Sequence, residues 1–275
     1  MPASSLDLRC AGREIHCTDW QPGGGGAARG TVVAWHGLAR SGRDMDALAA
    51  HLSAHGWRVL CPDTLGHGLS QWARHPKDEY CLAFHARLAR ELLAQLGIER
   101  CHWVGTSMGG AIGMVGASGY FEPELKRRIQ SLVLDDSAPR LAPPAIERIM
   151  ASAGPPPAFD TVTAPEACLP DGRVTTHHDP AIVAQFTHYP DDYLIWHHYD
   201  ALQVPVLLLR GAESDLVLRE TAEQMRTRGP GVRGGFEWVE VPAREHAPAL
   251  NVPNQLALVS GFIERVEQAG GSATI

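Results

Sequence analysis

The sequence predicts an α/β protein in which helices wind over both faces of a mostly parallel sheet. Short apolar, β-branched runs alternate along the chain with longer segments whose apolar residues recur every three or four positions. The strand-like runs are apolar throughout, as expected for strands that crossover helices cover on both faces. Strands in regular alternation with helices therefore argue for a doubly wound α/β sheet.

The expected elements follow in order from the amino end. Residues 6–10 and 14–19 are short alternating runs on either side of Ala11–Gly12, and they predict an antiparallel hairpin. A glycine-rich turn comes next, and the run TVVAW at 31–35 predicts the first strand that is buried on both faces. Further strands are expected at 57–61, 101–104, 129–134, 204–210 and 236–241, and helices at 43–55, 80–96, 108–118, 218–228 and 254–268.

One segment interrupts this alternation. Residues 137–200 hold ten of the 20 prolines and show no strand pattern. We expect a mostly helical cap there, inserted between two strands of a core that residues 1–136 and 201–275 form. Short helices fit 145–153, 179–185 and 191–199.

Composition and charge exclude several classes of protein. A formal net charge of −7 and the lack of any run of five basic residues argue against nucleic-acid binding. No apolar stretch approaches the roughly 18 residues of a membrane span, and no signal peptide is visible, so no membrane partner is expected. The six cysteines include no C-x-x-C pair, which favours a reduced, cytoplasmic protein. The sequence makes no prediction of oligomeric state.

The histidine-rich cap does not predict a metal site. Two of its histidine pairs are adjacent in sequence, and adjacent residues on a helix do not face the same way. No H-E-x-x-H or matching carboxylate set occurs, and we expect neither a metal nor a cofactor. The cap histidines are His177, His178, His188, His197 and His198.

A nucleophile motif follows the strand expected at 101–104. Gly105-Thr-Ser107-Met-Gly109 has the pattern G-x-S-x-G and is followed directly by a helix. In that context the serine occupies a sharp strand-to-helix turn and projects its Oγ at the carboxyl edge of the sheet. Small residues suit positions 105 and 109 because the turn is tight. We therefore expect Ser107 to be a nucleophile.

A serine hydroxyl needs a base, and the base needs a carboxylate that orients it. His246 lies on the loop after the strand expected at 236–241, and Asp215 on the loop after 204–210. Both loops meet Ser107 at the same edge of a parallel sheet. We expect His246 as the base and Asp215, which shares its loop with Glu213, as the acid. Asp136, with Asp135 after the strand at 129–134, is the alternative.

These motifs resemble the α/β-hydrolase superfamily, and the resemblance spans nearly the whole chain. It rests on WHGL at 35–38, CPDTLGHGLS at 61–70, GTSMGG at 105–110 and the loops of Asp215 and His246. It implies an eight-stranded, mostly parallel sheet flanked by helices. The stretches WHGLARSGRDMDALA and LVLDDSAP are similar to a bacterial subgroup described only as hydrolases or esterases, in which the position of Asp135 is often Asn.

The resemblance also implies the reaction. The backbone N–H groups of Leu38 and Met108 would form an oxyanion hole, and the serine would form an acyl-enzyme with a small-molecule ester, thioester or lactone. We also expect Trp35 and His36, next to Leu38, to line the substrate pocket, and the Met108 side chain to form a wall of the acyl pocket. Three alternatives stay open: a carbon–carbon bond hydrolase, a cofactor-free perhydrolase, and a non-catalytic binding protein of the same fold.

Overall fold

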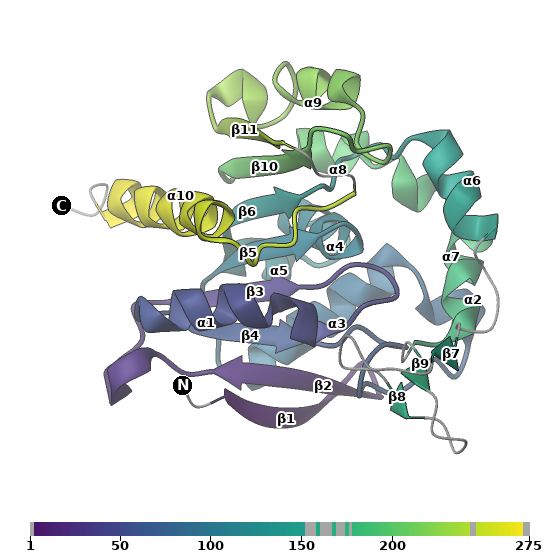
Figure 1. Ribbon diagram of the computed structural model, residues 1–275, viewed down its shortest axis with the longest axis horizontal. Helices are drawn as coiled ribbons and strands as arrows, with labels where there is room; N and C mark the ends of the chain where they lie inside the picture. The colour runs from purple at the N-terminus through teal and green to yellow at the C-terminus, as the bar shows by residue number, and fades with distance from the viewer. Residues whose placement is uncertain are drawn as a thin grey trace.

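One sheet of eight strands forms the centre of the molecule (Figure 1). The computed structural model describes residues 3–151, 158–159, 167–168, 174–175, 178–242 and 246–271. The strand order is β1-β2-β4-β3-β5-β6-β10-β11, and the six strands from β4 to β11 run parallel. The strands are β1 (Ala3–Cys10), β2 (Arg13–Trp20), β3 (Thr31–Trp35), β4 (Arg58–Pro62), β5 (Cys101–Thr106), β6 (Ile129–Asp135), β10 (Val206–Gly211) and β11 (Phe236–Val241).

Strand β2 runs opposite to the other strands of this sheet. Strand β1 pairs antiparallel with β2, and β2 pairs antiparallel with β4. The turn of that hairpin is at Ala11 and Gly12, which both have positive φ. The predicted amino-terminal hairpin and the predicted mostly parallel eight-stranded sheet are both confirmed.

Two hydrophobic clusters cover the two faces of the sheet. Because side chains alternate along a strand, Val32 and Ala34 of β3 join one cluster and Val33 and Trp35 join the other. Helices α1 and α10 cover the first face, and α3 and α4 the second (Figure 1). The helices outside the insertion are α1 (Asp46–Ala54), α2 (Pro76–Glu79), α3 (Leu82–Gln95), α4 (Met108–Ser118), α5 (Pro123–Arg128), α9 (Arg219–Met225) and α10 (Pro253–Gly271).

The segment between β6 and β10, which we call the insertion, lies at one end of the sheet (Figure 1). Besides short helices it contains a small antiparallel sheet in the order β7-β9-β8, which the sequence analysis did not predict. Two-residue strands give too short a pattern to recognise. The elements are α6 (Pro143–Ala151), β7 (Ala158–Phe159), β8 (Ala167–Cys168), β9 (Val174–Thr175), α7 (Ala184–His188) and α8 (Trp196–Asp200), with 3-10 turns at Pro180–Val183 and Pro190–Tyr193.

Hydropathy gives one further fact about the helices. Across the described ranges, none of them combines the length and the apolar character that crossing a bilayer requires.

Candidate active site

Ser107 occupies the turn between β5 and α4 in a conformation that L residues rarely adopt. Its φ is 50° and its ψ is −113°. The surrounding backbone holds it there: its N–H donates to the Asp135 carbonyl at 2.9 Å, and its own carbonyl accepts from Gly110 and Ala111. Strain of this kind persists only where neighbouring structure enforces it, and it is concentrated at functional sites.

The glycines on either side of Ser107 are required by close backbone contact. A Cβ on Gly105 would lie 2.3 Å from the backbone of Gly109. A Cβ on Gly109 would lie 2.3 Å from the carbonyl oxygen of Trp35, at the end of β3. The G-x-S-x-G pattern is therefore a steric requirement of the way β3, β5 and α4 meet.

His246 lies after β11, and its partner is a carboxylate at the end of β6. The His246 Nδ1–H donates to Asp136 Oδ2 at 2.6 Å. The Asp136 side chain is fully buried, whereas 33% of the His246 side chain is exposed. The pair therefore has one end anchored in the protein interior and an imidazole that solvent and ligands can reach.

Three further donors fix the Asp136 carboxylate. The Ser214 hydroxyl donates to Oδ2 at 2.7 Å, and the Ala247 N–H reaches the same oxygen at 3.3 Å. The Gly211 N–H donates to Oδ1 at 3.2 Å. With His246, these groups satisfy both oxygens of a buried carboxylate and keep it oriented.

Asp215 does not reach His246, so the expectation for the acid is corrected in favour of Asp136. Asp215 lies at the surface, where its carboxylate accepts from Arg148 of α6 at 2.7 Å. Glu213, on the same loop, is exposed as well. The inward position on this loop belongs to Ser214, whose hydroxyl meets Asp136. Asp136 was the alternative that the sequence left open.

Asp135, next to Asp136, is buried with a different environment. Its Oδ2 accepts from the Thr106 hydroxyl at 2.7 Å, and its Oδ1 has no hydrogen-bond partner within the described part of the chain. Burial, reinforced by the charge of Asp136, raises the pKa of Asp135 well above its usual range. The environment of Asp135 therefore favours its neutral form.

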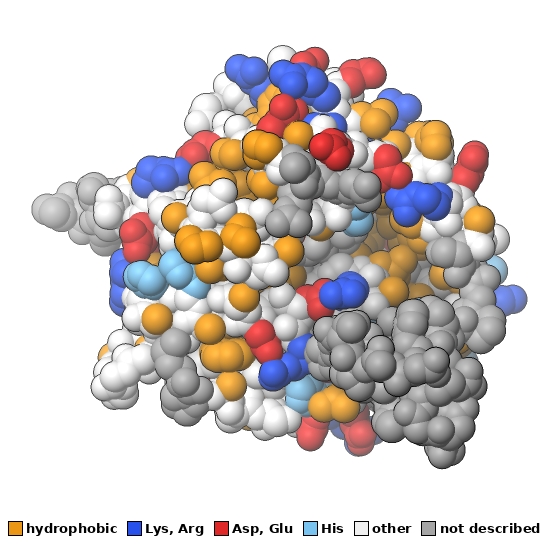
Figure 2. Space-filling view, viewed as in Figure 1, with side chains coloured by type: hydrophobic (Ala, Val, Ile, Leu, Met, Phe, Trp, Pro, Cys, Tyr) orange, Lys and Arg blue, Asp and Glu red, His pale blue; other side chains and the backbone are white. Residues whose placement is uncertain are grey.

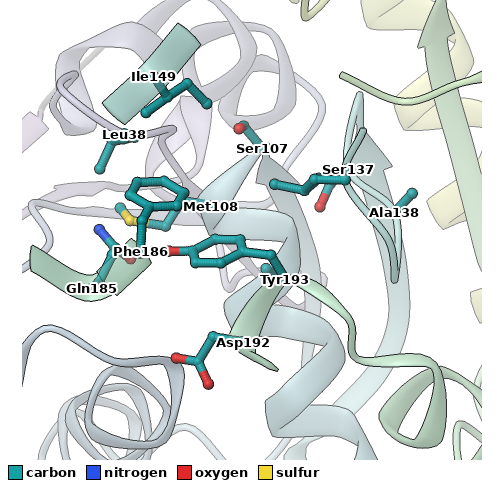
Figure 3. A pocket seen from close by; sticks show the side chains of 12 residues that line it. Leu38, Ser107, Met108, Ser137, Ala138, Ile149, Gln185, Phe186, Asp192 and Tyr193 are labelled. Atoms are coloured by element: carbon teal, nitrogen blue, oxygen red, sulfur yellow. Dashed lines mark hydrogen bonds between the residues drawn. The ribbon is translucent and has the colours of Figure 1, made fainter. Parts of the chain in front are cut away.

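The two expected oxyanion donors, Leu38 and Met108, both lie near Ser107. Met108 is the first residue of α4, where helix geometry leaves an N–H group without an intrahelical acceptor. Leu38 follows β3. A Cβ added to the preceding residue, Gly37, would lie 3.5 Å from the Ser107 Cβ, so this segment passes close to the nucleophile. Leu38, Ser107 and Met108 line one pocket together (Figure 3).

Two cavities meet at Ser107. A narrow, mostly apolar pocket of about 30 Å³ lies between the sheet and the insertion, and the Met108 side chain forms part of its wall, as expected. A wide cavity of about 740 Å³ is lined by both Ser107 and His246. Figure 2 shows a hollow right of the centre of this face, with hydrophobic side chains along one wall. The other apolar residues of the narrow pocket include Leu38, Ala111, Leu141, Ile149 and Phe186.

Trp35 and His36 lie beneath the site and do not line either cavity, which corrects the pocket prediction. Trp35 is buried, stacks on Trp103 and donates its Nε1–H to the Thr64 hydroxyl. His36 Nε2 accepts the Thr64 N–H at 2.9 Å, and its Nδ1–H donates to the Gly37 carbonyl. Each polar atom of these side chains is used inside the protein, so they support the segment before Leu38.

Sequence reasoning missed the Ser214 hydroxyl and the histidine of the loop at 63–70. No motif marks Ser214, because its role depends on which side chain of a loop turns inward. His67 is part of a recognised motif, but the sequence does not show its contact with the segment after Leu38. Within the described ranges, no three His, Cys, Asp or Glu side chains are grouped to hold an ion. His177 lies outside those ranges.

Comparison with known families and proteins gives a consistent result. Residues 30–178 match the α/β hydrolase fold family. A 3-hydroxybutyrate-oligomer hydrolase from Cupriavidus necator is 35% identical to the chain, over 84% of this chain and 87% of that protein.

Solved structures agree. An α/β hydrolase from Novosphingobium aromaticivorans is 29% identical, covers 96% of this chain and 98% of its own, and superimposes with a TM-score of 0.81. A protein from Rickettsia typhi, at 19% identity, covers 96% of this chain and 99% of its own with the same score. The second likeness concerns the fold alone.

Proposed function

Because the chain belongs to the α/β-hydrolase family, we propose that it is a serine hydrolase that cleaves a carboxylic ester through an acyl-enzyme. One observation carries the proposal. The strained turn of Ser107 and the imidazole of His246, fixed by buried Asp136, open onto the same cavity. A nucleophile, a base and a group that orients the base are the components of this chemistry.

The acid that we assign determines which nitrogen of His246 reacts. Because Nδ1–H donates to Asp136, the lone pair of the neutral imidazole is on Nε2. In the first step the Ser107 Oγ attacks the ester carbonyl while Nε2 takes its proton. The imidazolium that forms is stabilised by the Asp136 carboxylate, and Nε2 then returns the proton to the leaving alcohol. Water then attacks the acyl-enzyme while Nε2 takes a proton from it, and Nε2 returns that proton to the Ser107 Oγ as the carboxylic acid leaves.

The charge that develops on the carbonyl oxygen needs donors on the opposite side. We assign them to the N–H groups of Leu38 and Met108, because both residues line a pocket with Ser107 and the segment before Leu38 passes close to the Ser107 Cβ. The N-terminal end of α4 adds a favourable electrostatic potential. A single donor of this kind typically contributes about 2.7–4 kcal/mol to the stability of the transition state.

Two cavities and one relative support the substrate class that we propose. We place the acyl unit at the narrow apolar pocket and the alcohol portion in the wide cavity. The relative from Cupriavidus necator is a hydrolase of 3-hydroxybutyrate oligomers. We propose short oligoesters of a small hydroxy acid as the substrate class, with thioesters and lactones as chemically equivalent alternatives.

The test compares the protein with its Ser107→Ala variant on two sets of substrates. One set is p-nitrophenyl esters of increasing acyl length, and the other is the dimer and trimer of 3-hydroxybutyrate. We expect turnover by the unmodified protein, a preference for short acyl groups, and no turnover by Ser107→Ala. Ser118→Ala is the matched control, because Ser118 is a buried serine at the far end of α4.

Labelling by a fluorophosphonate separates the remaining possibilities. Labelling without turnover of either set would mean a reactive serine with another substrate. No labelling and no turnover would contradict the proposal and favour a binding protein. Turnover by Ser107→Ala would mean that another residue is the nucleophile.

A further inference from the structure

The loop at 63–70 binds the segment that follows Leu38 at two points. Asp63 Oδ1 accepts the Gly42 N–H at 2.6 Å, and His67 Nε2 accepts the Ala39 N–H at 3.1 Å. Asp63 also accepts from His16 and from the Leu69 N–H. Burial would raise the pKa of Asp63, but these hydrogen bonds outweigh it and keep the pKa below its usual value. An ionised carboxylate thus fixes the shape of the loop.

His67 is built into this loop as a hydrogen-bond acceptor. The side chain is fully buried, and its Nδ1–H donates to the Leu65 carbonyl at 3.1 Å. Nε2 must therefore carry a lone pair, which is what the Ala39 N–H requires. Burial, with His36, His85 and His178 nearby, holds the pKa of His67 well below its ordinary value. The hydrogen bonds and the burial together favour the neutral form of His67, in which Nε2 is an acceptor.

The backbone that His67 holds is strained and lies next to Ser107. Ala39 has a φ of 58°, a conformation that an L residue rarely adopts without support. The Leu38–Ala39 peptide, which carries the Ala39 N–H, and the Gly37–Leu38 peptide, which carries the Leu38 N–H, share the Leu38 Cα. Fixing the first peptide therefore limits the orientations of the second.

We propose that His67 is a positioning residue, which orients the Leu38 N–H toward the carbonyl oxygen of the substrate by accepting the Ala39 N–H. The inference rests on the proposed function, since it assigns a role only if Leu38 is an oxyanion donor. It gives the loop at 63–70 a part in catalysis without contact with the substrate.

The insertion fixes the same loop from the other side. The Asp179 N–H donates to the Gly66 carbonyl at 2.7 Å, and the Tyr80 hydroxyl donates to Asp179 Oδ2 at 2.5 Å. A backbone bridge joins His67 to His178. His67 is therefore held between the insertion and the segment that follows Leu38. A small displacement of its ring would be transmitted to Ala39.

Two amide variants test this role because they place a polar group at different points of the former ring. In His67→Gln the amide reaches the position of Nε2 and can accept from Ala39. In His67→Asn it reaches only the position of Nδ1, so the contact with Leu65 can persist while that with Ala39 is lost. We expect kcat to fall about 10- to 100-fold in His67→Asn, because a misoriented donor should cost less than the roughly 100- to 1,000-fold that follows the complete loss of an oxyanion donor, and to fall less in His67→Gln.

Two readouts distinguish positioning from a general structural effect. KM is expected to change less than threefold, because the ground-state ester does not depend on the oxyanion hole. The inhibition constant of an alkyl boronic acid, whose adduct with serine is tetrahedral, is expected to rise by about the same factor as kcat falls. His85→Leu is the matched control: His85 is equally buried, and among the described residues neither ring nitrogen has a hydrogen-bond partner.

The outcomes separate this inference from the proposed function. The role of His67 would be overturned if the Asn and Gln variants had the same kcat and the same boronate affinity as each other, with both folded by circular dichroism. An equal loss in His85→Leu would overturn it too, because the effect would then be one of core packing. An unmodified protein with neither turnover nor fluorophosphonate labelling would instead overturn the proposed function.

Discussion

The neighbouring strands β6 and β10 run parallel and end at the same edge of the sheet, and acidic residues follow both. The carboxylate after β6, Asp136, is buried and holds His246. The carboxylate after β10, Asp215, is exposed and pairs with Arg148 of the insertion. Two positions that look equivalent in topology therefore have opposite environments.

The difference arises from the distance of each acid from the end of its strand. Asp136 follows the last residue of β6 directly, and its φ of 46° turns the chain at once. Its N–H donates to the Leu209 carbonyl of β10 at 2.7 Å, so its backbone is still part of the sheet edge. Asp215 comes four residues after Gly211, the last residue of β10, on a loop that turns Ser214 inward. The backbone hydrogen bond to β10 therefore fixes the position of Asp136, whereas Asp215 has moved away from the edge of the sheet.

The largest effect that would test this comparison is expected for Asp136→Asn. The amide can keep the shape of the site but cannot stabilise the imidazolium or fix the tautomer of His246. We expect kcat on a p-nitrophenyl ester to fall about 1,000- to 10,000-fold, as for other triads that lose their acid. Steady-state kinetics over pH 6–9 would measure the loss.

A double variant checks whether the two acids can replace one another. Asp136→Asn combined with Asp215→Asn should be no less active than Asp136→Asn alone. A further loss in the double variant would show that Asp215 supports His246 when Asp136 is absent, and the contrast between the two strand ends would then be one of degree.

Ser214→Ala is expected to have an intermediate effect. It removes the 2.7 Å hydrogen bond to Asp136 Oδ2 without changing the charge. Because the Gly211 and Ala247 donors remain, we expect a decrease in kcat of about tenfold, in the range of one charge-assisted hydrogen bond. Activity equal to that of the unmodified protein would mean that the loop after β10 contributes nothing to the acid.

Asp135→Asn sharpens the comparison within the end of β6 through stability rather than rate. The folded protein holds the proton of Asp135 above the usual carboxyl pKa of 3.8, whereas the unfolded chain releases it. Folding therefore becomes less favourable as pH rises above 3.8, until the folded pKa is reached. Asn has no proton to lose, so the Tm of Asp135→Asn relative to the unmodified protein should increase from pH 5 to pH 9. A constant difference in Tm would mean that Asp135 is ionised in the folded state.

The smallest effect is expected for Asp215→Asn. More than half of each side chain in its pair with Arg148 is exposed, and such ion pairs typically contribute about 0–1 kcal/mol to stability. We expect kcat within twofold of the unmodified protein and an unchanged Tm. A loss of tenfold or more would mean that the loop after β10 rearranges to bring Asp215 to His246.

Most of the sheet could be predicted from the sequence because burial on two faces leaves a local signal. The run at 31–35 and the strand at 236–241 match β3 and β11 to the residue, and the helix at 108–118 matches α4. The helices α2 and α5 were missed because they have four and six residues, too few for periodicity. The small sheet of the insertion was missed for the same reason.

The candidate site divides in a similar way. The glycines around Ser107 constrain the backbone locally, so the motif predicts the strained turn. His246 was placed at the same edge of the sheet because it follows the strand at 236–241, and parallel strands end at one edge. The partner of His246 was assigned wrongly. Which carboxylate contacts His246 depends on the φ of Asp136 and on the side of its loop that Ser214 occupies. Neither is encoded in a short sequence pattern.

The close backbone contacts around Ser107 have a consequence for identifying the natural ligand. The close contacts around Gly105, Gly109 and Gly110 do not involve the Ser107 side chain. We therefore expect the turn to keep its shape when the Ser107 oxygen is removed. The Ser107→Ala protein should therefore be a receptor for the uncleaved compound. Incubated with a small-molecule extract and analysed by native mass spectrometry, it would retain the substrate that the active protein consumes.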